Sequence, residues 1–345
     1  MTHHPKSDIP RLHEAYSACF RIGAAVNPST LTTQADLFRH HFNSLTAENE
    51  MKFEKLQPAS GQYTFEAADR LIDFATANGM AVRGHTLVWH NQTPDWMFAH
   101  ADGTPVDRDT LLARMQAHIA TVVSRYKGIV HAWDVVNEAV SDKEGEFLRP
   151  SQWLEIAGED FIAKAFEYAH AADPNALLFY NDYNESVPEK REKIFALVQS
   201  LREKGVPIHG VGLQAHWNLE EPSIDDIRAA IERYASLGVR LHITELDLSV
   251  FRFADRRTDL TAPTEELLAK QADRYAQIFR LFKASSAHIE SVTFWGAADD
   301  YTWLDHFPVH GRKNWPFLFD EKHRPKRSFW DVLEEAPPSA IAGPG

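Results

Sequence analysis

The feature that most constrains the fold is a repeated order of elements, in which a helix ends at a glycine and a short apolar strand follows. The clearest examples place Gly79, Gly128, Gly205 and Gly238 between the two elements. Glycine adopts the left-handed conformation past a helix end at little cost. Pro188 and Ser223 are typical of helix starts. The pattern predicts helices at 71–78, 111–127, 161–171, 189–204, 223–237 and 265–284, and strands at 20–26, 44–49, 80–89, 129–138, 177–181, 211–217, 239–247 and 291–297.

About eight strand–helix units follow from this order, and their strands are too apolar to have a face in water. A closed parallel sheet surrounded by helices buries both faces of every strand. We therefore predict an α/β fold, a (β/α)8 TIM barrel with long loops at its C-terminal face. An open doubly wound sheet is the alternative, but it requires a topological switch point that the sequence does not indicate.

No Ser-, Gly- or Pro-rich linker divides the 345 residues. We expect one catalytic barrel domain over residues 1–345, with about eight N-terminal and about ten C-terminal residues as peripheral tails. The extra length lies in loops that follow strands, at 140–153, 183–188, 249–264 and 298–322. In a barrel these loops surround the C-terminal mouth, where active sites lie.

Composition excludes several classes of partner. A formal charge of −13 without a dense Lys/Arg stripe argues against nucleic acid. The one cysteine, Cys19, forms no disulfide framework. The start of the chain lacks the apolar core of a signal peptide, and no run reaches membrane-spanning length. We expect a cytoplasmic protein without a membrane partner; the oligomeric state stays open.

Common cofactor motifs fail in context. The segment GVGLQA at 210–215 resembles a dinucleotide fingerprint but lies within a predicted strand, and no helix follows it directly. Phosphate-loop and Gly-x-Ser-x-Gly motifs are absent from the sequence. His306 and His310 are spaced by four on a predicted loop, a weak basis for a metal site. We expect neither a cofactor nor a metal.

Polar and aromatic residues gather where the predicted strands end. Each of them alone has an ordinary structural explanation, but together they converge on one barrel mouth, which indicates a functional site. They are Glu48, Asn49, Lys52, His85, Trp89, Asn137, Glu138, Asn181, Asp182, Tyr183, Gln214, His216, Trp217, Glu245, Asp247 and Trp295.

Two glutamates stand out among these residues. Glu138 and Glu245 each end an apolar strand, where an ionised carboxylate is costly unless it is paired or used. Hydrolysis of a glycosidic bond needs one carboxylic acid and one carboxylate on either side of that bond. Amides and carboxylates suit sugar hydroxyls, and indole rings such as Trp89, Trp295 and Trp303 suit sugar faces.

These residues resemble the glycoside hydrolase family 10 xylanases. The segment WDVVNE at 133–138 is similar to that family's acid/base motif, and ITELD at 243–247 is similar to its nucleophile motif. Further matches are ENEMK at 48–52, RGHTLVWH at 83–90, GLQAH at 212–216 and TFWG at 293–296. The resemblance covers residues from about 10 to 335, in an order that fits a barrel.

The resemblance implies a retaining endo-1,4-β-xylanase, with Glu138 as the general acid and base and Glu245 as the nucleophile. Asn137 would hold the sugar 2-hydroxyl, and His216, backed by Asp247, would orient Glu245. The remaining implied sugar contacts are Glu48, Asn49, Lys52, His85, Trp89 and Gln214 on the glycone side, Tyr183 on the leaving side, and Trp295 and Trp303 as walls.

Strand alternation creates a difficulty for this assignment. Asn137 and Glu138 are neighbours, so a regular strand would turn their side chains to opposite faces. Both can serve the site only if the strand ends or bulges there. We therefore predict an irregularity at Asn137.

The lack of a leader and the loop from DDYTW at 299–303 to NWP at 314–316 are similar to the intracellular branch of this family. That branch implies xylo-oligosaccharides as substrates. Uronic acid decorations on them would meet His310, Arg312 and Lys313, since Arg binds a carboxylate in a bidentate way. The alternative is that these basic residues belong to a solvent-exposed loop that binds no ligand.

Two other functions stay open on the residues alone. One is another retaining β-glycanase with the same carboxylates, acting on glucans. The other is a sugar-binding barrel without catalytic activity. Loss of either glutamate from the sequence would indicate such a protein.

Overall fold

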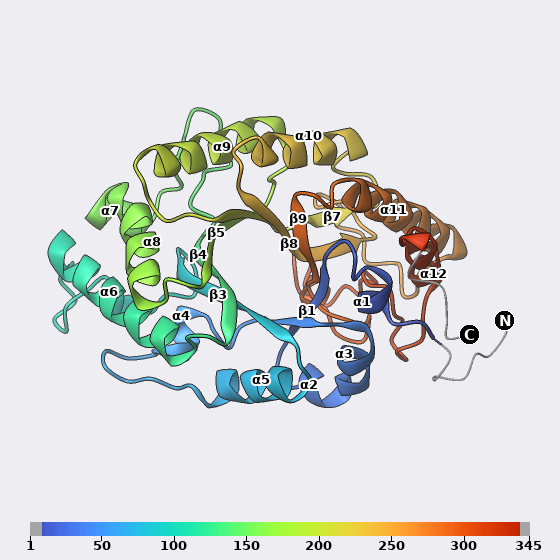
Figure 1. The fold of residues 1–345 in the computed structure, drawn as a ribbon, viewed down its shortest axis with the longest axis horizontal. Helices are drawn as coiled ribbons and strands as arrows, with labels where there is room; N and C mark the ends of the chain where they lie inside the picture. Colours follow the sequence, from blue (N-terminus) through green and yellow to red (C-terminus); the bar gives the residue numbers. More distant parts are fainter. Residues whose placement is uncertain (1–8, 339–345) are drawn as a thin grey trace.

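The computed structural model describes residues 9–338, and its strands form a closed parallel barrel with helices outside (Figure 1). The sheet has the order β6-β5-β4-β3-β2-β1-β9-β8-β7, and an additional β6–β8 pairing closes the ring. This confirms the predicted (β/α)8 TIM barrel and excludes the open sheet. The strands are β1 Arg21–Val26, β2 Ser44–Ala47, β3 Ala81–Trp89, β4 Val130–Asn137, β5 Leu177–Asp182, β6 Gly210–Leu213, β7 His216–Asn218, β8 Arg240–Ser249 and β9 Ile289–Phe294.

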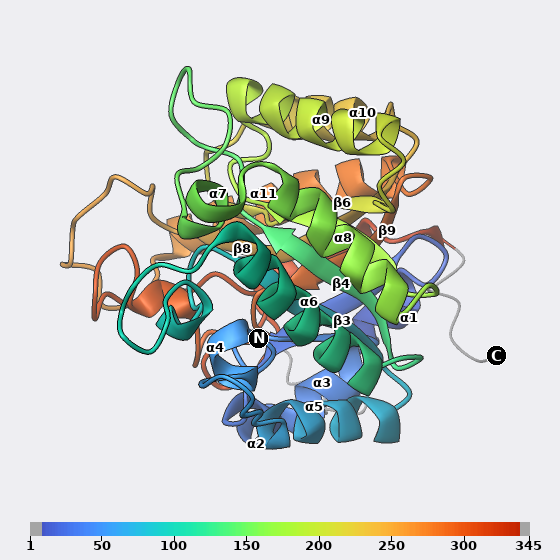
Figure 2. The same ribbon diagram turned by 90° about the vertical axis from the view of Figure 1, so that its left-hand side faces the viewer.

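Helices cover the outside of the barrel. In Figure 2, α6 and α8 lie in front of β3 and β4, and α8 contacts β4 and β5. The expected peripheral tails fall largely outside the described residues. The helices are α1 Leu12–Ala15, α2 Thr30–Thr33, α3 Ala35–His41, α4 Phe53–Leu56, α5 Glu66–Ala77, α6 Arg108–Arg125, α7 Gln152–Ala157, α8 Asp160–Ala172, α9 Pro188–Glu203, α10 Ile224–Ala235, α11 Glu265–Ala284 and α12 Arg327–Glu334, with short 3-10 turns at Asp95–Met97 and Trp303–Asp305.

The glycine, proline and serine residues that predicted the helix ends have the expected local structure. The glycines that follow α5 and α9, Gly79 and Gly205, have φ angles of +65° and +75°. Pro188 stands at the start of α9. The Ser223 hydroxyl accepts a hydrogen bond from the Asp226 backbone at 3.1 Å and so caps α10.

The expected sixth strand over 211–217 is wrong in one respect, because the structure divides it into β6 and β7. Both halves pair with β8, but Ala215 between them has a φ of +61°. A left-handed residue interrupts the extended backbone, and strand propensity alone gives no sign of it.

The inside of the barrel is polar beneath the mouth. Arg83 on β3 donates to His242 on β8 at 3.0 Å, and these strands are not neighbours, so the bond crosses the barrel interior. Arg83 also forms a fully buried ion pair with Asp134 on β4. Burial disfavours the Asp134 charge, but Arg83 and His85 outweigh it and hold the pKa of Asp134 at about 2.

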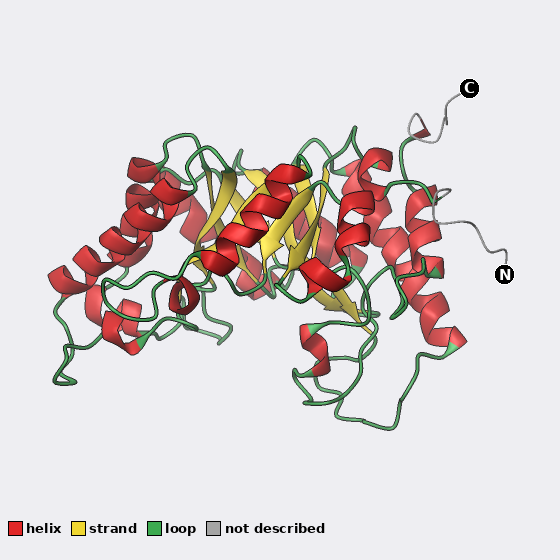
Figure 3. Cartoon of the chain, turned by 90° about the horizontal axis from the view of Figure 1, so that it is seen from below, coloured by secondary structure: helices red, strands yellow, loops and turns green. Residues whose placement is uncertain are grey.

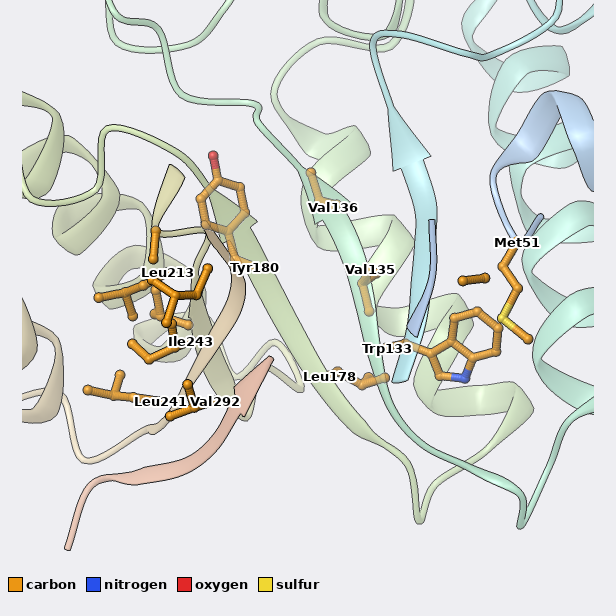
Figure 4. Close-up of a cluster of buried hydrophobic side chains, with 14 of the residues drawn as sticks. Met51, Trp133, Val135, Val136, Leu178, Tyr180, Leu213, Leu241, Ile243 and Val292 are labelled. Carbon is orange, nitrogen blue, oxygen red and sulfur yellow. The ribbon is translucent and has the colours of Figure 1, made fainter. Parts of the chain in front are cut away.

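Apolar residues on the outer faces of the strands form the core with the helices. Figure 4 shows Leu241, Ile243 and Val292 gathered together, and Trp133 directed toward Met51. Trp133 fits because Gly84 lies against its ring: a Cβ at Gly84 would come within 2.1 Å of it. This arrangement leaves the barrel interior to the polar residues that lead to the site.

Long loops extend from the barrel (Figure 3). The segments after β2, β4, β5 and β9 carry several of the predicted site residues, among them Glu48, Glu138, Tyr183 and Trp303. Between residues 9 and 338, no helix combines the length and apolar character needed to cross a bilayer.

Candidate active site

Glu138 and Glu245 face one another across the mouth through a set of amide side chains. Gln214 Nε2 donates to Glu138 Oε1 at 2.9 Å and lies 3.3 Å from Asn137 Oδ1. Asn181 Nδ2 donates to Glu245 Oε1 at 2.8 Å and to Asn137 Oδ1 at 2.9 Å. Each amide therefore links Asn137 to one glutamate, and Asn137 lies between the two carboxylates.

The predicted irregularity at Asn137 is confirmed. Strand β4 ends at that residue, and Glu138 has a left-handed φ of +56°. The pairing of β4 with β5 also shifts register between Asp134 and Val136. The backbone turn brings the Asn137 and Glu138 side chains into the same mouth, although their positions are adjacent.

Asn137 Oδ1 is fully used by these two amides. Its Nδ2 group makes no hydrogen bond within residues 9–338 and is therefore free to donate to a ligand hydroxyl. The Glu138 carboxylate is held from its other side by Trp89, whose indole N–H donates to Oε2 at 2.8 Å.

A histidine lies between two carboxylates behind Glu245. His216 Nε2 is 3.0 Å from Glu245 Oε2, and its Nδ1 is 3.0 Å from Asp247 Oδ2. Burial lowers the proton affinity of the ring, but Asp247 and Glu245 outweigh it and raise the pKa of His216 to about 10. Trp303 donates to the same Asp247 oxygen at 2.8 Å.

Glu245 is held in its ionised form. Burial opposes its charge, but His85 and the hydrogen bond from His216 outweigh burial and leave the pKa of Glu245 below its usual value. His85 Nδ1 lies 4.0 Å from Glu245 and 2.9 Å from Asp134. The Trp295 ring meets the His85 ring edge-on, with 5.3 Å between centroids.

The His216 pKa predicts how stability depends on pH. The folded-state pKa, about 10, lies above the ordinary value of 6.5, so His216 contributes its full stabilisation below about pH 6.5 and loses it as pH rises through about 10. We expect the free energy of unfolding, measured by urea denaturation, to fall across this range. His216→Phe should show a flatter dependence. Equal slopes in the two proteins would contradict the charged histidine.

Lys52 and the residues beside it form another wall of the mouth. Lys52 Nζ donates to Asn49 Oδ1 at 3.0 Å and lies 4.9 Å from the Trp89 ring centroid. Burial lowers the pKa of Lys52, although the surrounding carboxylates, Glu245 first, oppose this. Glu48 is nearly buried and accepts hydrogen bonds from Asn27 and Tyr301, each at 2.9 Å.

Tyr183 lies on the other side of Glu138. Arg149 Nη2 donates to the Tyr183 hydroxyl at 2.7 Å, and Arg149 Nε donates to the Glu138 backbone carbonyl at 3.0 Å. Tyr183 also donates to Asp142. The loop after β4 and the loop after β5 are thereby joined next to Glu138.

Three residues of this mouth, Asn181, Arg149 and Tyr301, lie outside the implied catalytic residues and sugar contacts. Asn181 was identifiable from the sequence as a polar residue at a strand end. Its side chain packs closely against the backbone of Gly212, where an added Cβ would come within 2.2 Å of Asn181 Oδ1. Arg149 and Tyr301 come from loops, where no periodic pattern gives a signal. The strand-end residue Trp217 is the converse case, because its indole donates to Glu185 and packs near Phe282 of α11, away from the mouth.

Arg312 corrects the expectation of a uronic acid site. The side chain is only 3% exposed and donates to the backbone carbonyls of Asp255 and Arg257 at 2.7 and 3.3 Å. Its guanidinium therefore joins the loops after β8 and β9 and is not available to a ligand. Lys313 pairs with Asp305 at 2.8 Å, and His310 is exposed.

Among residues 9–338, no cluster of three or more His, Cys, Asp or Glu side chains is placed to hold a metal ion. The rings of His306 and His310 lie 5.0 Å apart between centroids, but no carboxylate or thiolate completes a set with them there.

Comparison with known proteins gives a consistent result. The family model described as Glycosyl hydrolase family 10 matches residues 11–335. An endo-1,4-beta-xylanase of Geobacillus stearothermophilus is 63% identical over 329 residues, which are 95% of this chain and 99% of that relative. A beta-1,4-xylanase of Dictyoglomus thermophilum is 49% identical over 327 residues, covering 95% and 91% of the two chains. The crystal structure of xylanase XynB from Paenibacillus barcinonensis, complexed with a conduramine derivative, superposes with a TM-score of 0.94 at 58% identity and covers 95% of this chain and 99% of that one.

Proposed function

Because the chain belongs to glycosyl hydrolase family 10, we propose that it is a retaining endo-1,4-β-xylanase that cleaves β-1,4-xylosidic bonds by double displacement with two glutamates. The observation that carries the assignment of Glu138 and Glu245 is the amide bridge through Asn137. Asn181 and Gln214 each span from Asn137 to one carboxylate. The bridge brings both carboxylates to one mouth, and retention, in which the nucleophile contacts the sugar directly, is the course that family 10 enzymes follow.

Glu245 acts as the nucleophile in this proposal. His85 and His216 keep it ionised, so one of its oxygens can attack the anomeric carbon. In the same step Glu138 gives its proton to the departing glycosidic oxygen, which leaves as the hydroxyl of the released sugar. In the second step Glu138 takes a proton from water, the water oxygen attacks the anomeric carbon, and the bond to Glu245 breaks.

The other mouth residues bind and orient the sugar. The free Asn137 Nδ2 donates to the 2-hydroxyl next to the reacting carbon, where a hydrogen bond strengthens in the transition state. Glu48, Asn49 and Lys52 supply polar contacts on the glycone side. The sugar faces pack on aromatic walls. The remaining sugar contacts in this proposal are His85, Trp89, Gln214, His216, Trp295, Trp303 and, on the leaving side, Tyr183.

The finer features of the proposal concern the substrate and its setting. The substrates are xylo-oligosaccharides, the location is the cytoplasm, and residues 1–345 form one catalytic domain. If the substrates carry uronic acids, His310 and Lys313 are the basic residues of this loop that remain accessible, because Arg312 is buried. No nucleic acid, membrane or cofactor takes part.

Proton NMR of the anomeric signals during digestion of xylotetraose tests the function. We expect β-anomeric reducing ends first and slow mutarotation afterwards. If the α anomer appears first, the reaction proceeds with inversion and the double-displacement mechanism is wrong. Cleavage of cello-oligosaccharides but not xylotetraose would indicate the alternative glycanase, and no cleavage of either would indicate a silent binding barrel.

A further inference from the structure

A buried carboxyl group that takes no part in the two chemical steps lies next to Glu138. Asp182, at the end of β5, is fully buried and accepts hydrogen bonds from the Tyr180 hydroxyl at 2.5 Å and the Tyr183 backbone at 2.9 Å. Lys190 Nζ lies 3.1 Å from it. Burial raises the pKa of Asp182 to about 7; Lys190 opposes this, and the Glu138 charge adds to it. A carboxyl group this costly to bury calls for a role beyond packing.

Tyr180 connects Asp182 to the chain that follows Glu138. The Tyr180 side chain is fully buried, and its hydroxyl accepts a hydrogen bond from the Val140 backbone N–H at 2.9 Å while it donates to Asp182. Asp182 fixes the direction of this hydroxyl, because a hydroxyl that donates to the carboxylate turns its lone pair toward Val140. The pair therefore holds the backbone two residues beyond Glu138.

The backbone at Glu138 needs such support. A left-handed φ of +56° is costly for a residue with a Cβ and persists only where the surroundings enforce it. Hydrogen bonds hold the segment on three sides: Glu138 N donates to Asn181 O at 2.9 Å, Arg149 Nε donates to Glu138 O at 3.0 Å, and Arg149 N donates to Ala139 O at 2.8 Å.

These supports form one network. Arg149 is paired with Asp142 at 2.9 Å, and Lys190 lies between Asp142 and Asp182 at 2.9 and 3.1 Å. Lys190 itself is 3% exposed. Arg149 holds the Glu138 backbone carbonyl, and Tyr180 holds the Val140 backbone N–H. The ion pairs through Asp142 and Lys190 connect Arg149 to Asp182 and so to Tyr180.

We propose that Tyr180 and Asp182 are positioning residues for the acid step: their hydrogen-bonded pair fixes the turn at residues 138–140, so that the Glu138 carboxyl points at the departing oxygen. This inference rests on the proposed role of Glu138 as the acid. Neither residue touches the sugar in this scheme.

Tyr180→Phe tests the pair with little change in volume, through the dependence of rate on the leaving group. Phenyl β-xylobioside and xylotetraose need a proton from Glu138 for departure, whereas 2,4-dinitrophenyl β-xylobioside leaves without one. We expect kcat/KM, which reports the first displacement, to fall roughly 10-fold or more for the first two substrates. The dinitrophenyl substrate should change less than about 2-fold, because it does not use the acid.

Two further variants separate positioning from general loss of structure. Tyr16→Phe removes an equally buried hydroxyl, bonded to the Val332 carbonyl at 2.6 Å far along the chain, and should leave all three rates unchanged. Asp182→Asn keeps an acceptor for Tyr180 and should keep most of the wild-type ratio between substrates. Equal losses on all substrates in Tyr180→Phe, or no loss on any, would overturn the positioning role.

The same series separates this inference from the function on which it rests. Glu138→Ala must itself slow the phenyl substrate far more than the dinitrophenyl substrate. If Glu138→Ala slows both substrates equally, the acid role of Glu138 fails. If Glu138→Ala shows the difference between substrates and Tyr180→Phe does not, only the positioning role fails.

Discussion

Glu245→Ala is expected to reduce kcat on phenyl β-xylobioside by at least about 10⁴-fold, because no other described group lies where it can form the covalent intermediate. The fold should persist, since Asp247 still pairs with His216 at 3.0 Å. Binding of xylotetraose, measured by calorimetry, should remain within about 10-fold, because the amide and indole contacts stay in place.

The control for this variant is Glu266→Ala. Glu266 has a side chain that is 77% exposed on α11, so its loss removes a carboxylate without touching the mouth. Wild-type turnover is expected for it. Substantial activity in Glu245→Ala, with the control unchanged, would refute the nucleophile assignment.

Glu138→Ala has the second large expected effect. Loss of a general acid costs roughly 10²- to 10⁴-fold on substrates with poor leaving groups. For 2,4-dinitrophenyl β-xylobioside the first step should survive, and the enzyme should stall as the glycosyl-enzyme because no base activates water. Added azide needs no base, so it should restore turnover and form a β-xylobiosyl azide.

The azide product is identified by NMR and mass spectrometry. A product of α configuration, or no acceleration by azide, would contradict the placement of Glu138 beside the departing oxygen. Gln214→Glu is not an adequate control here, because Gln214 donates to Glu138 directly. Tyr16→Phe serves instead, since its hydroxyl donates to the Val332 carbonyl.

Sequence patterns predicted the barrel because each unit carries its own local signal. A glycine with a positive φ, such as Gly79, marks where a helix must end whatever lies around it. The polar strand ends were also readable, since Glu138 and Glu245 stand out against apolar runs. Alternation of side chains along a strand even indicated where β4 had to become irregular.

Features that depend on contacts between distant segments were not readable in the same way. Arg312 looked like a ligand-binding residue because a basic loop gives no indication of which backbone carbonyls it will meet. The division of β6 from β7 depends on one left-handed residue, Ala215, of a type that rarely adopts that conformation. Arg149 lies in a loop sequence with no periodicity, although its side chain holds Glu138.

The bond from Arg83 to His242 across the barrel, together with the Arg83–Asp134 ion pair, restricts how this sequence can diverge. Removing one partner from a buried ion pair typically costs about 3–5 kcal/mol, because the remaining charge is left without water. A lineage that exchanged Arg83 alone would therefore pass through a weakly folded protein. We expect these positions to change together or not at all, so the polar interior, like the catalytic mouth above it, constrains the mutational history of the barrel.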